Sequence, residues 1–195
     1  MSNKKRAVII IGIILGAILL SALINLCITS VQKSKHPKKY SEEITLYAKE
    51  FNVPEYIIYA VINTDSNFDS EKVYEDGAKG LMHISYDVYT KLYSAEHLDE
   101  EALFEDLKKT DISIRFGTYY LRYLFNCYGS WDTAIVAYKV GEKTVNDWLL
   151  DKENSKDGTT LKSIPDKKAK KYLKKVNTSI DYYKDTYYRN GAFTK

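Results

Sequence analysis

The sequence predicts an all-α domain preceded by one N-terminal transmembrane helix, and three observations lead to this fold class. Residues 7–28 form an apolar run that is broken only by glycine, Ser21, Asn25 and Cys27. After residue 40, apolar side chains recur at spacings of three and four, which is the period of a helix. No segment of useful length alternates with the two-residue period of a strand. About 155 residues follow the leader, which is enough for one domain with its own core.

The apolar run is long enough to cross a bilayer. Its 22 residues, at a rise of ~1.5 Å each, match a hydrocarbon layer roughly 30 Å thick. A cleaved signal peptide would have a shorter apolar region and an Ala-x-Ala-like site, and the sequence has neither. Cys27 follows Ile24-Asn25-Leu26, which is a poor context for a lipidated cysteine because small residues are expected there. We therefore expect an uncleaved anchor at residues 7–28.

The segments around the anchor define the predicted domain organisation. Lysine or arginine flanks the anchor on both sides, so the positive-inside rule gives no clear orientation. The short leading tail favours a domain that faces outward. The predicted organisation is a cytoplasmic tail at 1–6, the anchor at 7–28, a basic linker at 29–39, a folded domain at 40–188 and a tail at 189–195.

The charge distribution argues against nucleic acid as a partner. Residues 1–39 hold seven Lys and Arg and no acidic residue, although the whole chain carries a net charge of +3. The remainder has 22 Lys and Arg against 26 Asp and Glu, a net charge of −4. A nucleic-acid-binding domain would carry its positive charge on the folded part.

The cysteine and histidine content predicts neither a disulfide framework nor a metal site, and no cofactor is expected. Cys27 and Cys127 are the two cysteines, and their segments belong to different environments. The three histidines and two distant cysteines make no zinc-ligand spacing. We expect Cys127 to be a buried apolar residue.

The first helix of the domain is expected to begin at Ser41. Ser41 is a suitable N-cap, and Glu42 and Glu43 would lie in the first turn, where acidic residues complement the helix dipole. Asn52 is placed to end this helix, and Pro54 suits the first position of the next one.

The second helix carries a carboxylate at the end of an apolar stripe. Ile58, Val61, Ile62 and Asp65 are spaced at i, i+3, i+4 and i+7, so they share one helix face. An acidic side chain on an otherwise aliphatic helix face is unusual and calls for an explanation. The segment after it, residues 66–80, contains two glycines and several acids and is expected to be a loop.

Three further segments complete the predicted fold. A buried helix is expected over about 111–126, where the apolar spacing involves Ile112, Phe116, Tyr119, Tyr120 and Tyr123. A short apolar helix should run from Trp131 to Tyr138, with Gly141 placed to cap its end. Residues 151–163 are polar and are expected to be an exposed loop. A long amphipathic helix should follow Pro165, with its apolar face at Ala169, Tyr172, Leu173, Val176, Ile180 and Tyr183.

Three short motifs occur in a specific order within these elements: Asn63-Thr64-Asp65-Ser66-Asn67-Phe68, then Gly77-Ala78-Lys79-Gly80-Leu81-Met82-His83, then Ala137-Tyr138-Lys139-Val140-Gly141. Their order, spacing and helical settings resemble the lytic transglycosylase domain of the soluble type, which is related to goose-type lysozyme. The similarity runs from about Tyr40 to Tyr183, and Gly-Ala-x-Gly-Leu-Met is its most specific part. The resemblance implies a lysozyme-like helical domain.

The resemblance also implies a substrate and a reaction. Family enzymes cleave the glycan strands of peptidoglycan between N-acetylmuramic acid and N-acetylglucosamine, and the muramic 6-hydroxyl closes onto the anomeric carbon to leave a 1,6-anhydro end. One carboxyl group first protonates the leaving oxygen and then removes the proton of the incoming hydroxyl. Such a group is obtained by burying a carboxyl against apolar side chains. The expected partners are therefore glycan strands and, through residues 7–28, a membrane, with the domain on the extracytoplasmic side. The sequence indicates no protein partner.

The sequence departs from the family pattern at three functional positions. The family has glutamate where this chain has Asp65, glutamine where it has His83, and Asn-Ala where it has Lys139-Val140. Aspartate is one methylene shorter than glutamate, so its carboxyl lies roughly 1.5 Å further back along a fixed helix. A displacement of about 1 Å can cost on the order of 100-fold in rate. Activity therefore requires a groove that reaches in to Asp65.

The candidate site residues each have a second interpretation. Asp65 is the candidate catalytic acid, although it can instead end a helix or pair with a cation. Lys139 would bind a muramyl carboxylate, pair with Asp65 or point into solvent. The resemblance implies that Tyr138 reaches the catalytic carboxyl, and the alternative is a core tyrosine.

The other candidate substrate-binding residues are Ser66, Met82 and His83. Ser66 would contact the sugar or the carboxyl, or else serve as a helix-end hydroxyl. Met82 would pack beneath the groove. His83 would donate to a glycan carbonyl or assist proton transfer, the alternative being a structural histidine. A catalytically inactive, glycan-binding protein of cell-wall assembly on the same fold remains the competing functional hypothesis, and a hydrolase that admits water is a third.

Overall fold

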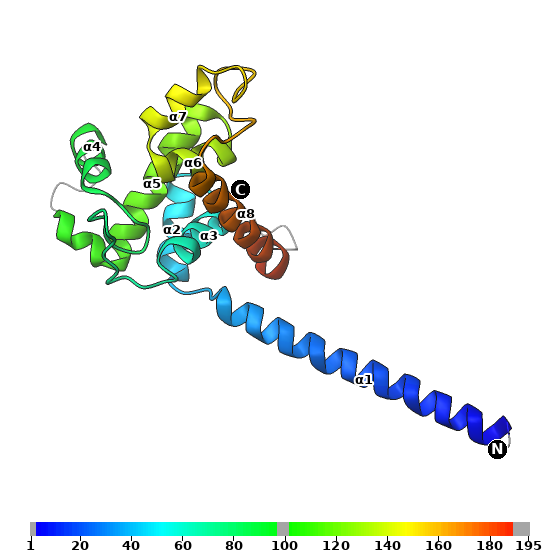
Figure 1. The fold of residues 1–195 in the computed structure, drawn as a ribbon. Coiled ribbons are helices and arrows are strands. Elements are labelled where there is room, and N and C mark those ends of the chain that lie inside the picture. Colours follow the sequence, from blue (N-terminus) through cyan, green and yellow to red (C-terminus); the bar gives the residue numbers. More distant parts are fainter. Residues whose placement is uncertain (1–2, 97–101, 189–195) are drawn as a thin grey trace. The chain divides into compact units, whose positions relative to one another are not determined.

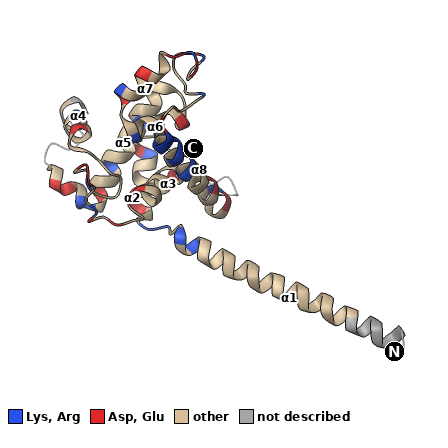
Figure 2. Ribbon diagram, in the orientation of Figure 1, with Lys and Arg blue, Asp and Glu red and all other residues tan. Residues whose placement is uncertain are grey.

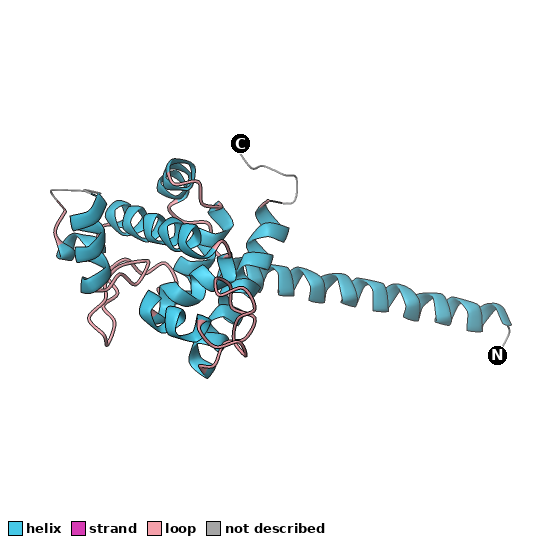
Figure 3. Cartoon of the chain, turned by 90° about the horizontal axis from the view of Figure 1, so that it is seen from above, coloured by secondary structure: helices cyan, strands magenta, loops and turns pink. Residues whose placement is uncertain are grey.

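The computed structural model describes residues 3–96 and 102–188, and its helices confirm the predicted all-helical fold class. Within these ranges the only β-structure is three isolated bridges, and helices joined by loops make up the rest (Figure 3). The predicted tail at 189–195 lies outside the described residues. The chain divides into two compact units, Met1–Pro37 and Lys38–Lys195.

The first unit is a single helix, α1 (Asn3–Lys35). Its large apolar side chains from Ile10 to Val31 are each more than half exposed, and Figure 2 shows no charge over this stretch. The helix is long and apolar enough to cross a membrane. It extends beyond residues 7–28 at both ends, so part of the predicted tail and linker is also helical.

The second unit contains the remaining helices (Figure 1). In chain order they are α2 (Ser41–Glu50), α3 (Glu55–Asp65), α4 (Tyr86–Glu96), the 3₁₀ helix η1 (Phe104–Lys108), α5 (Thr110–Tyr128), α6 (Trp131–Val140), α7 (Glu142–Leu149) and α8 (Lys167–Tyr187). The most extensive contacts are those of α3 with α8 and of α5 with α6, and α2 packs on α5. The core lies between these helices.

The start of α2 differs from the prediction. Ser41 is the first residue of the helix rather than its cap, because Tyr40 before it adopts a left-handed conformation with φ 56° and no side chain caps the helix. The Tyr40 hydroxyl group donates a hydrogen bond to the backbone carbonyl oxygen of Phe68, with 3.4 Å between the two oxygens. Asn52, at φ 53°, follows the end of α2 as predicted. Pro54 lies one position earlier than predicted, as the residue before α3.

The helices predicted around 111–126, 131–138 and after Pro165 are all present. In α5, Phe116 and Tyr120 are buried, whereas the other predicted positions are only half-buried and Ile114 and Leu121 complete the buried face. α6 ends at Gly141 as predicted. α8 buries five of its six predicted apolar residues, leaving Leu173 half-buried.

The structure also contains elements that the sequence patterns did not predict. The segments that form α4, η1 and α7 were not assigned to helices. The prediction that Cys127 is buried was wrong: the residue lies on the exposed side of the last turn of α5.

Candidate functional site

Asp65 is the last residue of α3, and the chain turns sharply immediately after it. The Ser66 hydroxyl donates to the carbonyl of Ile62 at 3.0 Å and accepts from the backbone N–H of Phe68 at 3.1 Å. Asn67 and Phe68 both have left-handed backbones, with φ of 53° and 64°. Ser66 is therefore a helix-end hydroxyl that fixes the turn, and the turn leaves the Asp65 side chain at the end of the apolar face of α3.

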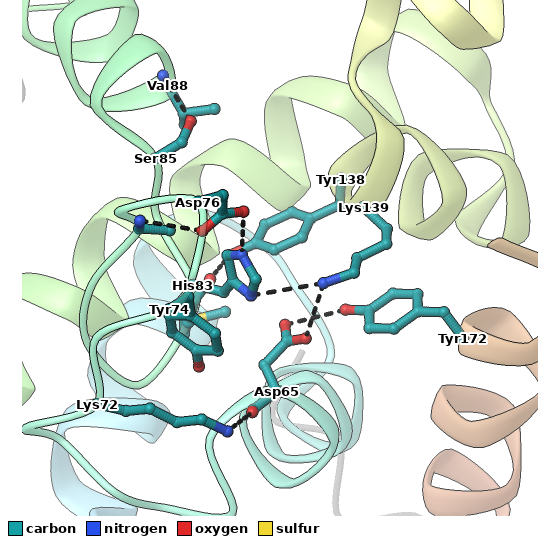
Figure 4. A network of polar contacts seen from close by, with 12 residues as sticks. Asp65, Lys72, Tyr74, Asp76, His83, Ser85, Val88, Tyr138, Lys139 and Tyr172 are labelled. Atoms are coloured by element: carbon teal, nitrogen blue, oxygen red, sulfur yellow. Dashed lines mark hydrogen bonds and ion pairs between the residues drawn. The ribbon is translucent and has the colours of Figure 1, made fainter. Parts of the chain in front are cut away.

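The Asp65 carboxyl group is almost completely buried, with 4% of its side chain exposed. Its Oδ2 accepts a hydrogen bond of 3.0 Å from the Tyr172 hydroxyl on α8, and its Oδ1 lies 4.0 Å from the Lys139 ammonium group (Figure 4). Lys72 donates to the Asp65 backbone carbonyl at 2.5 Å. Three segments far apart in sequence therefore meet at this residue.

Burial raises the pKa of the Asp65 carboxyl, because the charged form loses its hydration. The neighbouring Lys139 acts in the opposite direction, followed by His83 and the hydrogen bond from Tyr172, and these only partly offset the effect of burial. The result is a carboxyl group that holds its proton to higher pH than an exposed aspartate does. This is the property that a general acid requires.

His83 has a left-handed backbone, with φ 53°, and its ring stacks on Tyr74 with centroids 3.7 Å apart. Its Nε2 lies 2.8 Å from the Asp76 carboxylate, and its Nδ1 lies 3.5 Å from the Lys139 ammonium. An ionised carboxylate only accepts, so Nε2 donates to Asp76. Nδ1 contacts Lys139, and Asp76, His83, Lys139 and Asp65 form one chain of contacts (Figure 4).

Tyr138 does not contact the carboxyl group as the family resemblance implied. Its hydroxyl donates to the backbone carbonyl of Met82 at 2.6 Å, and the tyrosine that reaches Asp65 is Tyr172. Tyr138 nevertheless lines the pocket beside Asp65. It ties the turn that carries His83 to α6.

Two glycines explain the packing of the Gly-Ala-x-Gly-Leu-Met segment. Gly80 has φ +77°, and a Cβ there would overlap the carbonyl oxygen of Leu107. Gly117 on α5 leaves room for Met82, because a Cβ at that position would overlap the thioether sulfur. Met82 is fully buried, as expected for a residue beneath the groove. The turn before His83 is thus held against η1 and α5.

Two pockets border Asp65, and His83 and Lys139 also line both of them. The first has a volume of about 230 Å³ and lies between the Asp76–Val88 segment and α6, with Tyr138 and Gly141 in its wall. The second has a volume of about 390 Å³ and lies towards α8. Asp65 thus borders two pockets, although its carboxyl group is almost completely buried.

The structure brings four of the six predicted site residues together, namely Asp65, His83, Tyr138 and Lys139. Ser66 and Met82 are buried and line neither pocket, so their contribution is to position the neighbours. Sequence reasoning missed the contacts of Tyr172 and Lys72 with Asp65 and the contact of Asp76 with His83. The periodicity of α8 places Tyr172 on the buried face, but no pattern names its partner. Among the described residues, no group of three His, Cys, Asp or Glu side chains is placed to hold a metal ion.

Comparison with known proteins gives consistent matches. The family described as "Transglycosylase SLT domain" matches residues 42–161. The soluble lytic murein transglycosylase of Salmonella typhimurium is 24% identical over 154 residues, which are 78% of this chain and 24% of that protein. The chain therefore spans about a quarter of the length of this relative.

Solved structures match to the same extent. The 70 kDa soluble lytic transglycosylase from Escherichia coli, also solved in complex with bulgecin A, has a TM-score of 0.70 at 23% identity, covering 80% of this chain and 25% of that one. An inactive Glu→Gln mutant of the lytic transglycosylase Slt from Pseudomonas aeruginosa has a TM-score of 0.68 at 22% identity, covering 77% and 24%. These likenesses confirm the lysozyme-like fold. With more than half of its length matched by the family, the chain belongs to the transglycosylase SLT domain family.

Proposed function

We propose that this protein is a membrane-anchored lytic transglycosylase that cleaves peptidoglycan between N-acetylmuramic acid and N-acetylglucosamine, with Asp65 as the catalytic acid. The observation that carries the proposal is the environment of the Asp65 carboxyl group. It is buried at the end of an apolar helix face, its pKa is raised by that burial, and it borders two pockets.

The proposed reaction uses this one carboxyl group twice. Protonated Asp65 gives its proton to the glycosidic oxygen as the bond from that oxygen to the anomeric carbon breaks. The muramic 6-hydroxyl then closes onto the anomeric carbon, and its proton returns to the carboxylate. The product is a 1,6-anhydro end, and no second carboxylate is needed as a nucleophile.

The shorter acid is compatible with this proposal because the pockets reach it. The half-buried rings of Tyr138 and His83 and the stem of Lys139 wall the first pocket around Asp65. Tyr172 holds one carboxylate oxygen, which limits the orientations of the group. Orientation of the acid is the requirement that a one-methylene deletion threatens most.

The other candidate substrate-binding residues take supporting roles in this proposal. His83 and Lys139 line both pockets and are the side chains placed to contact an amide or carboxylate of the glycan. Ser66 and Met82 hold the turns on which Asp65 and His83 lie. We further propose that α1 anchors the protein in a membrane, with the domain on the extracytoplasmic side, where peptidoglycan is found.

Product analysis tests the proposal. The full chain in non-ionic detergent is incubated with purified peptidoglycan, and the soluble products are identified by mass spectrometry, with Asp65→Asn as the matched control. We expect 1,6-anhydro ends from the wild type and at least ~100-fold fewer from the variant, because general acid catalysis contributes on the order of 10²–10⁴. Reducing ends that carry an added water would instead identify a hydrolase. No new ends from the wild type would refute cleavage.

A second candidate function, glycan binding without cleavage, is favoured by one specific observation. The ammonium group of Lys139 lies 4.0 Å from Oδ1 of Asp65, and a cation at that distance favours the charged carboxylate over the proton donor. The two candidates differ in a binding experiment with insoluble peptidoglycan. A binding protein would co-sediment with the polymer equally well as wild type and as Asp65→Asn, and would release no products.

A further inference from the structure

The larger pocket beside Asp65 has an unusual excess of positive charge. Five lysines line it, and Asp65 is its one acidic lining residue. They come from three parts of the chain: the loop after α3 (Lys72), the end of α6 (Lys139), and one face of α8 (Lys168, Lys171 and Lys175). The Asp65 carboxyl group is itself buried, with 4% of its side chain exposed, and Lys139 is the lysine of the five that lies within 4.0 Å of it.

Two of the ammonium groups that line the pocket lie against aromatic rings. Lys72 Nζ lies 4.9 Å from the centre of the Tyr74 ring and donates to the backbone carbonyl of Asp65. Lys139 Nζ lies 5.2 Å from the centre of the Tyr172 ring. Cation–π contacts of this kind hold an ammonium group in place while leaving its positive charge available to a ligand. These two groups are therefore pre-organised.

The three lysines on α8 are exposed and form no ion pair within the described part of the chain. They are spaced at i, i+3 and i+7, so they share one face and extend over roughly 10 Å at ~1.5 Å per residue. Residues 167–175 contain six lysines, and the first turn of α8 contains no acidic residue (Figure 2). Cations near a helix N-terminus oppose the helix dipole, so this arrangement does not serve the stability of α8.

We propose that this lysine pocket binds a linear polyanion, a polymer whose negative charges repeat along its length, next to the catalytic groove. A row of ammonium groups along a helix face fits a ligand with repeated charges better than it fits one carboxylate. Apart from His83, the basic lining residues are lysines, whose ammonium groups bind anions as point charges. The proposal deepens the proposed function, because Asp65 and Lys139 border both pockets, but binding at the lysine pocket does not require cleavage.

The two faces of α8 supply a matched pair of variants. Lys168→Gln/Lys171→Gln/Lys175→Gln removes the three lining lysines. Lys167→Gln/Lys170→Gln/Lys174→Gln removes three exposed lysines with the same spacing that do not line the pocket. Both triple variants remove the same charge from the same helix, so a difference between them reports on the pocket and not on net charge.

The experiment measures binding of a fluorescently labelled linear polyphosphate to the full chain in non-ionic detergent, over a range of salt concentrations. We expect the slope of log K against log[salt] to fall by about two in the lining triple variant and to stay near the wild-type value in the other, since each lost phosphate contact removes roughly 0.7 from the slope. Circular dichroism confirms that both variants keep their helices. Thermal unfolding midpoints within a few degrees of the wild type keep a loss of binding interpretable.

Competition by other polymers shows whether the ligand is recognised by its charge. Unlabelled polyphosphate and polyglutamate of matched charge should displace the probe, whereas a neutral chitin oligosaccharide should not. Equal loss of binding in the two triple variants, or equal competition by the neutral oligosaccharide, would overturn the proposal. Either result can occur whether or not the protein cleaves peptidoglycan, so failure here is distinguishable from failure of the proposed function.

Discussion

The hydrogen bond from Tyr172 to Asp65 makes a prediction that separates this structure from the family resemblance. Tyr172→Phe removes a hydroxyl group that donates to Oδ2 at 3.0 Å and changes little else in volume. Tyr138→Phe removes a neighbouring hydroxyl that donates to the Met82 carbonyl instead. The resemblance implies that Tyr138 holds the catalytic carboxyl, so the two variants should behave in opposite ways under the two accounts.

The sign and size of the effect follow from the geometry. A hydroxyl group that donates to a carboxylate stabilises the charged form and lowers the pKa, so its loss raises the pKa of Asp65 further. A hydrogen bond to a charged group contributes about 1.5–3 kcal/mol, and one pKa unit corresponds to about 1.4 kcal/mol. The neutral acid also accepts from Tyr172, so only part of this free energy separates the two protonation states. We expect the pKa of Asp65 to rise in Tyr172→Phe and to stay unchanged in Tyr138→Phe.

Carbon-detected NMR measures this directly. The side-chain carboxyl carbons of aspartate are titrated in the wild type and both variants, and the Asp65 signal is assigned by its absence in Asp65→Asn. If the pKa of Asp65 rose in Tyr138→Phe and did not rise in Tyr172→Phe, the assignment of Tyr172 as the partner of Asp65 would be refuted. An Asp65 signal that titrates like an exposed aspartate would refute the burial argument itself.

Three further predictions follow from the same contacts. Lys139→Met should raise the pKa of Asp65 more than Tyr172→Phe does, because Lys139 is the largest influence that lowers it, and the same titration checks this order. The folded-state pKa of Asp65 is raised, so the carboxyl's contribution to stability is complete below pH ~3.9 and is lost as the pH rises through the folded-state value. Asp65→Asn should therefore unfold at a higher temperature than the wild type at pH 7 and at the same temperature near pH 3. A lower midpoint at pH 7 would contradict the sign. Gly80→Ala should destabilise by more than about 2 kcal/mol in chemical denaturation, and Gly77→Ala should cost clearly less, since both have positive φ but only Gly80 lies against Leu107.

Periodicity predicted the helices that carry a continuous apolar face. α3, α5, α6 and α8 each have such a face, and each was located from the sequence within a few residues. α4, η1 and α7 pack on α5 and α6, and a local sequence pattern does not report such contacts. The cap of α2 was misplaced because Tyr40 adopts a left-handed backbone and the helix begins at Ser41 itself. Tyr40 contacts Phe68, 28 residues further along the chain, and a local pattern does not report such a contact.

The candidate site was predicted only in part, again because some of its contacts join residues that are far apart in the sequence. The motifs identified Asp65, His83, Tyr138 and Lys139, and the structure places all four around one pocket. Tyr138 matches the alternative interpretation, a core tyrosine whose hydroxyl is satisfied elsewhere. Tyr172 was missed as the partner of the carboxyl group because it is 107 residues from Asp65, and only the packing of α3 on α8 brings them together.

The central claim is that Asp65 is the acid that transfers the proton, and one measurement tests it most directly. The rate of release of 1,6-anhydro ends from peptidoglycan is recorded against pH for the wild type and Tyr172→Phe, alongside the pKa of Asp65 in each protein. A general acid works only while protonated, so the rate should fall above the measured pKa of Asp65, and in the variant this fall should occur at a correspondingly higher pH. If the rate fell at the same pH in both proteins although the pKa of Asp65 differed, the claim would be contradicted.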